Sequence, residues 1–203
     1  IAEVLKSIPA DQMIVSDVGN NEYWLCRAYA YRQCSNLVIY SKSFGAMGSS
    51  IGKAIGMYYG TRKPVVCFVG DQALQMNIQE FQHLASQQLP ITIVLLNNYS
   101  SGMIRSREKQ RYGEDFIHTT LESGYSVPDF CSLAEGYGIK AYTVDQFDFM
   151  KIETILLSRS CAQLLEIRVD PSIEMIPRTA WGDPFQKMSP QLDNDEYESS
   201  NIM

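Results

Sequence analysis

The chain has 203 residues, of which 45% are hydrophobic and 20% charged, and its formal net charge is −6. This acidic balance argues against a nucleic-acid binder, which would carry a basic surface, and no apolar run approaches the roughly 20 residues that cross a bilayer. The length suits one domain with a sizeable hydrophobic core.

Apolar segments of two kinds alternate along the chain. Short apolar runs between Gly, Pro and polar residues predict buried strands, and apolar residues at helical spacing predict helices. In chain order the sequence predicts helix 1–7, strand 13–16, helix 22–32, strand 37–40, helix 48–59, strand 65–69, helix 77–88, strand 91–96, helix 128–136, strand 140–144, helix 147–158 and strand 163–169. Asn77, followed three residues later by Glu80, predicts a capped start for the helix over 77–88. The alternation predicts an α/β fold with an open, mostly parallel sheet and helices on both faces.

Two segments fall outside this alternation. Residues 99–127 predict a long loop, and loops of this length usually have functional roles. We expect residues 1–176 to form the domain, and residues 177–203 to form a C-terminal arm and tail. The arm, over 175–188, is expected to pack over the domain and to cover Trp181 at least partly. The tail ends QLDNDEYESSNIM, an acidic composition poor in apolar residues that is typical of disorder.

The segment from Val65 to Asn98 predicts a strand, a helix and a second strand in one βαβ unit. The carboxyl ends of both strands then lie at one edge of the sheet, where open α/β folds bind ligands. Asp71 follows the first strand and Asn98 follows the second, so their side chains are expected to meet. A carboxylate and an amide oxygen suit a hard cation such as Mg²⁺. The alternative is that Asp71 caps the next turn and that Asn98 belongs to an ordinary turn.

Gly70-Asp71 and Asn97-Asn98 are accompanied by further motifs along the chain. These are DVGNNEYW, SFGAMGSSIGKAIG, QMNIQEFQHLASQQLPITIVLLNN, NNYSSGMI, PDFCSLAEGYGIKA and LLEIRVD. Together they resemble the thiamine diphosphate (ThDP) enzymes, in particular the acetolactate synthase branch, over residues 1–176. The region that matches is the C-terminal, diphosphate-binding domain of that family. The family's pyrimidine-binding domain, which supplies the glutamate that activates the cofactor, has no counterpart in these residues.

The resemblance implies a set of metal and cofactor ligands. Asp71 and Asn98 would ligate Mg²⁺ through their side chains, and Ser100 through its backbone carbonyl. Besides these three, the positions that the resemblance assigns to ThDP are Val18, Gly19, Asn20, Asn21, Gly45, Met47, Gly70, Gln72, Ala73, Gly102 and Met103. No catalytic residue is expected within this chain, because the activating glutamate belongs to the pyrimidine-binding domain.

Two of these positions would hold the pyrimidine ring. In relatives the backbone carbonyl at the position of Gly45 accepts from the aminopyrimidine, and the backbone N–H at the position of Met47 donates to a ring nitrogen. The Met47 side chain would lie beneath the cofactor and keep it bent. Glycine permits the close approach of the backbone, and a flexible thioether fills an irregular gap. The alternative is that Met47 is an ordinary core residue.

The sequence departs from the family pattern at three places. Gln72 stands where relatives commonly carry Gly or Ala, so its side chain must point away or reach a phosphate oxygen itself. Residues 18–21 stand where the family segment ends in Gln-His, and asparagine offers an amide donor but no imidazole; an ordinary Asx turn is the alternative. Arg107 stands where acetolactate synthases carry a tryptophan that helps to select the second keto acid. We hypothesise that Arg107 selects an anionic or phosphorylated substrate; a solvated charged loop is the alternative.

The resemblance implies that the whole protein is a ThDP- and Mg²⁺-dependent 2-oxo acid decarboxylase or carboligase, and that this chain alone is inactive. The alternatives are a small subunit of a two-chain ThDP decarboxylase and a non-catalytic domain that has lost the cofactor. We expect a 2-oxo acid substrate and a homodimer or tetramer, without nucleic acid or membrane. FAD, which some relatives need, would bind outside this chain. The five cysteines form no CxxC pair, which predicts reduced, mostly buried thiols in a cytoplasmic protein.

Overall fold

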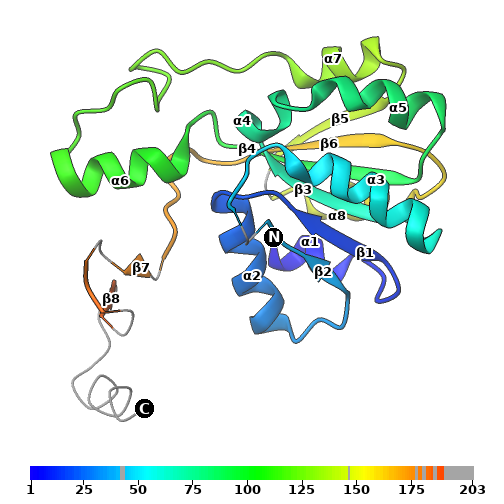
Figure 1. Cartoon of the computed structure of the whole chain (residues 1–203), viewed down its shortest axis with the longest axis horizontal. Coiled ribbons are helices and arrows are strands. Elements are labelled where there is room, and N and C mark those ends of the chain that lie inside the picture. Colours follow the sequence, from blue (N-terminus) through cyan, green and yellow to red (C-terminus); the bar gives the residue numbers. More distant parts are fainter. Residues whose placement is uncertain (42–43, 146, 177, 180–181, 185–186, 190–203) are drawn as a thin grey trace.

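A single parallel sheet forms the centre of the molecule in the computed structural model, which describes residues 1–41, 44–145, 147–176, 178–179, 182–184 and 187–189 (Figure 1). Its six strands are β1 (Met13–Ser16), β2 (Val38–Ile39), β3 (Val65–Gly70), β4 (Ile91–Asn97), β5 (Lys140–Asp145) and β6 (Gln163–Arg168). They lie in the order β2-β1-β3-β4-β6-β5, and every neighbouring pair is parallel. The predicted α/β fold with an open sheet is therefore confirmed.

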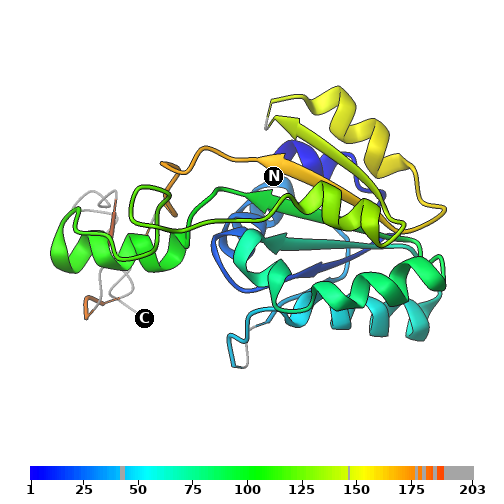
Figure 2. The same ribbon diagram turned by 90° about the horizontal axis from the view of Figure 1, so that it is seen from above.

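Helices cover both faces of the sheet. The described residues form α1 (Ala2–Lys6), α2 (Asn20–Arg32), α3 (Ser49–Thr61), α4 (Asp71–Gln75), α5 (Phe81–Ser86), α6 (Gly102–Tyr112), α7 (Phe130–Gly136) and α8 (Phe149–Leu157). One core cluster joins the sheet to α3, α4, α5 and α7, and the other joins it to α1, α2 and α8. Figure 2 shows α8 on one side of the sheet and α3 with α5 on the other. Within the described residues, no helix is both long and apolar enough to cross a membrane.

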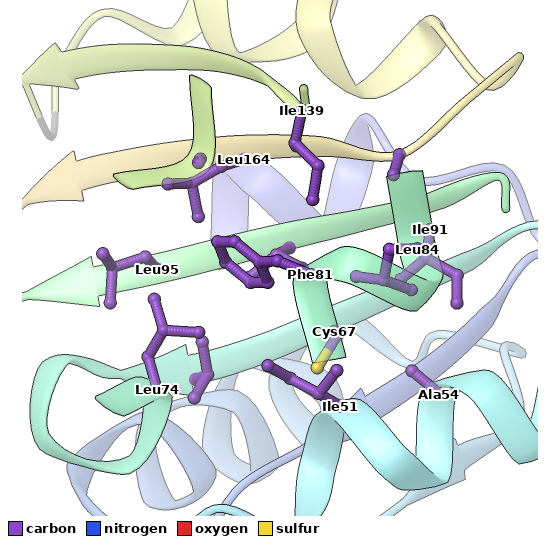
Figure 3. Close-up of a cluster of buried hydrophobic side chains, with 14 of the residues drawn as sticks. Ile51, Ala54, Cys67, Leu74, Phe81, Leu84, Ile91, Leu95, Ile139 and Leu164 are labelled. Atoms are coloured by element: carbon purple, nitrogen blue, oxygen red, sulfur yellow. The ribbon is translucent and has the colours of Figure 1, made fainter. Parts of the chain in front are cut away.

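The central strands supply both core clusters because successive side chains on a strand point to opposite faces. In β3, Cys67 belongs to the cluster under α3 and α5, whereas the adjacent Phe68 belongs to the cluster on the opposite face. Figure 3 shows the first cluster, in which Phe81 of α5 lies over the sheet between Leu95 and Leu84, and Leu84 lies beside Ile91. A strand buried on both faces is apolar at every position, which is why runs such as VVCFV were readable in the sequence.

The helix predicted over 77–88 is divided in the structure. The chain forms α4 directly after β3, then a 3₁₀ turn over Ile78–Glu80, and only then α5. The predicted cap is wrong, because Asn77 makes no side-chain cap and Glu80 makes none for α5. Asn77 instead donates its side-chain amide to the carbonyl of Gly48, which precedes α3. A tertiary contact takes the place of the local cap.

Residues 99–127 are not a continuous loop, because they contain α6. The prediction was wrong since it looked for apolar periodicity, and Ser106 is the only buried residue of this helix. Its sequence, GMIRSREKQRY, is instead rich in residues with high intrinsic helix propensity. Both views show α6 standing away from the sheet, beyond the carboxyl ends of the strands (Figures 1 and 2).

The segment after β6 and the start of the C-terminal arm contact α6 through charged side chains. Glu174 forms ion pairs of 3.1 Å with Lys109 and 3.0 Å with Arg178, and Arg178 also donates to Ser106 Oγ at 2.6 Å. Arg105 donates to the carbonyl of Pro171. Farther along, β7 (Arg178–Thr179) pairs antiparallel with β8 (Met188–Ser189). The predictions for Trp181 and for the acidic tail concern positions outside the described residues.

All five cysteines are free thiols. The expectation that they are mostly buried is wrong, because only Cys67 is buried and Cys26 is exposed. Cys67 lies on β3, inside the core, whereas Cys26 and Cys131 lie on helices and Cys34 and Cys161 lie in connections between elements. Burial raises the pKa of the Cys67 thiol to about 12, so this residue packs as a small apolar group.

Candidate functional site

One cavity lies at the carboxyl edge of the sheet, where β1, β3 and β4 end. The parallel register pairs Gly70 with Leu96, so the residues after β3 and β4 emerge side by side. All 14 residues that the resemblance assigns to metal and cofactor line this cavity, namely Val18, Gly19, Asn20, Asn21, Gly45, Met47, Gly70, Asp71, Gln72, Ala73, Asn98, Ser100, Gly102 and Met103. The expected convergence of Asp71 and Asn98 is therefore seen in the structure, while the roles of the 14 residues stay predictions.

Sequence reasoning missed four further lining residues. They are Trp24, Leu96, Ser101 and Ile104. Leu96 and Ser101 could have been predicted, because Leu96 ends the predicted strand just before Asn98 and Ser101 lies between two predicted site residues. Nothing in the sequence distinguishes Trp24, which reaches the cavity from the second turn of α2.

Asp71 is the first residue of α4, and only 3% of its surface is exposed. Its Oδ1 accepts from the backbone N–H of Gln72 at 2.8 Å, whereas its Oδ2 is buried without a hydrogen-bond partner among the described residues. Burial raises the pKa of this carboxyl to about 6, and the Gln72 N–H, the Tyr125 hydroxyl and the Ser100 N–H oppose the rise only in part. A buried carboxylate oxygen with no partner is costly, and a bound cation would satisfy it.

Tyr125 is a neighbour of Asp71 that the sequence did not indicate. Its hydroxyl is buried and faces the Asp71 carboxylate, although the two groups do not reach ordinary hydrogen-bond geometry. Burial first, and then the charge of Asp71 and the interaction with its carboxylate, raise the pKa of this phenol. Tyr125 is therefore the protein donor that faces Asp71, and it lies outside the described lining of the cavity.

The turn after β4 presents Asn98 and Ser100. Asn98 is 7% exposed and follows Asn97, whose Oδ1 accepts from the backbone N–H of Tyr99 at 3.1 Å. The Ser100 hydroxyl donates to the carbonyl of Thr119 at 2.7 Å, so its proton is not available to a ligand. The Ser100 carbonyl accepts from the Gly102 N–H at 2.7 Å, which leaves its second lone pair for a metal.

The side chain of Asn97 is fixed by a hydrogen bond to a buried acid, Glu166 of β6. Glu166 Oε1 accepts from Asn97 Nδ2 at 2.6 Å, and its Oε2 accepts from Thr143 Oγ1 at 3.0 Å. Cys131 Sγ lies 3.7 Å from Oε2. Because Asn97 also shapes the turn that carries Asn98, Glu166 is a positioning residue for the candidate metal site.

We expect Glu166→Ala to lower the free energy of unfolding by about 1–3 kcal/mol, because it leaves the buried Asn97 amide without an acceptor. Glu166→Gln should retain most of that stability, since its carbonyl still accepts from Asn97 and its amide donates to Thr143 Oγ1. Urea unfolding of both variants measures the difference. Equal losses for the two substitutions would contradict the assigned hydrogen bonds.

Asp17, at the end of β1, fixes the loop before α3. Its Oδ1 accepts from the N–H groups of Val18 at 2.9 Å and Gly48 at 3.1 Å, and its Oδ2 accepts from the N–H of Ser50 at 2.9 Å. Asn77 holds the same loop by donating to the Gly48 carbonyl. The motif DVGNNEYW contains Asp17, but its partners are about 30 residues away, so the sequence did not reveal this role.

The asparagine pair that opens α2 has two different environments. Asn21 donates its amide to Ser16 Oγ at 3.2 Å and to the Asp17 carbonyl at 2.7 Å, so both of its donors are engaged within the protein. Asn20 Oδ1 is buried without a partner in the described residues. A Cβ placed on Gly102 would lie 2.6 Å from Asn20 Nδ2, so glycine is required for this close approach. Of the two, Asn20 is the one with an unsatisfied group beside the cavity.

Met47 lines the cavity and is 36% exposed, so it does not belong to either core cluster. The neighbouring Phe44 is 96% exposed. Arg107, the predicted substrate residue, lies on α6 outside the lining of the cavity and is exposed to solvent. Its part in substrate selection stays a prediction.

The donor set of the cavity fits Mg²⁺ and a diphosphate. No cluster of three or more His, Cys, Asp or Glu occurs in the described residues, as expected if one carboxylate and neutral oxygens are the ligands. Asp71 is the only charged side chain among the described lining residues. A cation bound to Asp71 could therefore neutralise an anionic group here.

Comparison with known proteins gives consistent matches. The model of the family described as "Thiamine pyrophosphate enzyme, C-terminal TPP binding domain" matches residues 17–156. The chain is 37% identical over 136 residues to an acetolactate synthase large subunit of Porphyra purpurea, covering 66% of this chain and 22% of that protein. It is 33% identical over 168 residues to the large subunit of Lactococcus lactis subsp. lactis, covering 82% of this chain and 28% of that protein. It is 32% identical over 165 residues to the isozyme 2 large subunit of Escherichia coli K12, covering 80% and 29%. The chain spans less than a third of the length of these relatives.

Proposed function

This chain belongs to the thiamine pyrophosphate enzyme family as a C-terminal TPP-binding domain, and we propose that its cavity holds the diphosphate of ThDP together with Mg²⁺. Asp71, Asn98 and the Ser100 carbonyl are the proposed metal ligands. The residues after β1 and before α3 would contact the rest of the cofactor. When bound, ThDP supplies an electron sink for the carbanion that forms when a 2-oxo acid loses CO₂.

The observation that carries this proposal is the electrostatic character of the cavity. Among the described lining residues, the only charged side chain is a buried carboxylate with one unsatisfied oxygen. A diphosphate beside Asp71 would be repelled in the absence of a metal, and the described part of the lining has no Lys or Arg to offset the charge. The site therefore favours diphosphate and Mg²⁺ as a pair over either one alone.

For the whole protein we propose a decarboxylase or carboligase similar to acetolactate synthase, with a pyrimidine-binding domain completing the site. Exposed apolar side chains in the lining and next to it support contact with another domain or subunit, namely Met47 and Ile104 in the lining and Phe44 beside Gly45 in the sequence. A homodimer or tetramer would supply such a contact. On this proposal the chain alone binds the cofactor but does not turn over substrate.

The proposal is tested by calorimetric titration of the chain with ThDP, with and without Mg²⁺. We expect binding that depends on Mg²⁺ and that is lost in Asp71→Ala. Asp11→Ala is the matched control, because Asp11 is exposed and precedes β1 at the opposite end of the strands. The same titration is repeated with a pyrimidine-binding domain supplied. Absence of Mg²⁺-dependent binding in both arrangements would contradict the proposed function.

A further inference from the structure

Gln72 bridges the two loops that carry the candidate metal ligands. It is the second residue of α4, and its Oε1 accepts from the hydroxyl of Ser101 at 3.0 Å. Ser101 is the residue that precedes α6. Both side chains line the cavity. The bridge thus connects the segment with Asp71 to the segment with Ser100.

The hydrogen bond to Ser101 orients the amide of Gln72. The hydrogen bond to Oε1 fixes the orientation of the amide group and therefore the position of Nε2. Nε2 has no hydrogen-bond acceptor among the described residues. The Gln72 side chain is partly buried, so this donor is neither fully solvated nor satisfied by protein. An amide NH₂ provides two donors, and such donors suit an anionic acceptor in the cavity.

The backbone at the same position is already committed. The N–H of Gln72 donates to Asp71 Oδ1 at 2.8 Å, which removes it as a direct donor to an anion. A side-chain amide one residue after the metal-binding carboxylate would replace that lost backbone contact. Glycine or alanine at this position could not make such a replacement.

We propose that Gln72 Nε2 donates a hydrogen bond to a phosphate oxygen of ThDP and that Ser101 orients the amide for it. The proposal rests on the proposed function and adds a side-chain ligand for the diphosphate. Gln72 is a binding residue in this scheme, and Ser101 is a positioning residue.

The variant Gln72→Glu distinguishes a residue that donates to a phosphate oxygen from one that only contacts Ser101. Its carboxylate still accepts from Ser101 Oγ, but it has no amide donor and adds a negative charge beside the diphosphate. We expect Gln72→Ala to weaken Mg²⁺-dependent ThDP binding about 10-fold, as for loss of a hydrogen bond to a charged group, and Gln72→Glu to weaken it further. Ser101→Ala should cost only a few-fold, because the amide remains but is less ordered. Calorimetry with ThDP, and separately with inorganic pyrophosphate and Mg²⁺, gives these affinities.

Gln75→Glu is the matched control, because it adds the same charge to the exposed side of the same helix. Wild-type affinity in Gln72→Glu, with loss in Gln72→Ala and Ser101→Ala, would show a structural bridge and overturn the proposal. An effect of Gln72→Ala on ThDP but not on pyrophosphate would also overturn it. In both cases the wild-type chain still binds ThDP, so the proposed function stands. Absence of wild-type binding would instead overturn the proposed function and this inference together.

Discussion

Replacing Asp71 with asparagine is expected to stabilise the metal-free chain at pH 7 while it abolishes Mg²⁺-dependent binding of ThDP. Burial raises the pKa of Asp71 from 3.8 to about 6, so the folded state favours the neutral carboxyl. The contribution of the neutral Asp71 carboxyl to the free energy of unfolding is fully present below about pH 4, and it is lost as the pH rises through about 6. A rise in pKa of this size corresponds to at most about 3 kcal/mol, and we expect asparagine to recover about 1–3 kcal/mol of it.

The measurement is urea unfolding of wild type and Asp71→Asn without metal, at pH 4.5 and at pH 7.5. The advantage of asparagine should shrink at the lower pH, where the wild-type carboxyl is largely protonated. With saturating Mg²⁺ and ThDP the order should reverse, because only the wild type gains stability from binding. Asp11→Asn controls for the loss of an exposed charge. A variant less stable than wild type at pH 7.5 without metal would contradict the assigned cost of the buried charge.

Gly48→Ala should disrupt the loop before α3 and lower the free energy of unfolding by about 2–3 kcal/mol. Gly48 has φ of +79°, a conformation that side chains other than glycine rarely adopt. An added Cβ would also lie 2.6 Å from Met76 Cβ, which is fixed by its own backbone and cannot swing away. The same loop carries Gly45 and Met47, so ThDP affinity should fall as well.

Gly56→Ala provides the contrast within the same element. Gly56 lies inside α3, and an added Cβ would meet nothing within 4 Å. Alanine there should raise the free energy of unfolding by about 0.5–1 kcal/mol, because it has the higher helix propensity. Chemical unfolding of both variants checks the opposite signs. Similar effects for the two would show that the strain assigned to Gly48 is absent.

The strands and the place of the site were predictable because their signals are local. A strand buried on both faces is apolar throughout, and parallel strands bring Asp71 and Asn98 to one edge whatever the details of packing. The roles of Asp17 and Glu166 were not predictable in this way. Their partners lie 31 to 33 residues and 69 residues away in sequence, and the contacts exist only once the sheet has formed.

The wrong predictions have related physical causes. Asn77 has the sequence pattern of a helix cap, but its side-chain amide donates to the carbonyl of Gly48 instead. Helix α6 has almost no buried face, so a search for apolar periodicity could not detect it. The sequence was compatible with a Gln72 side chain that points away from the cavity and with one that reaches a phosphate oxygen. Its direction depends on Ser101, which lies 29 residues later.

The attachment of α6 gives the cavity two kinds of lining. Residues that follow β1, β3 and β4 come directly after strands whose side chains belong to the two hydrophobic clusters. Met103 and Ile104 belong to a helix that neither cluster includes within the described residues, and Lys109 of this helix pairs with Glu174. A displacement of α6 would therefore open that part of the lining without disrupting either cluster.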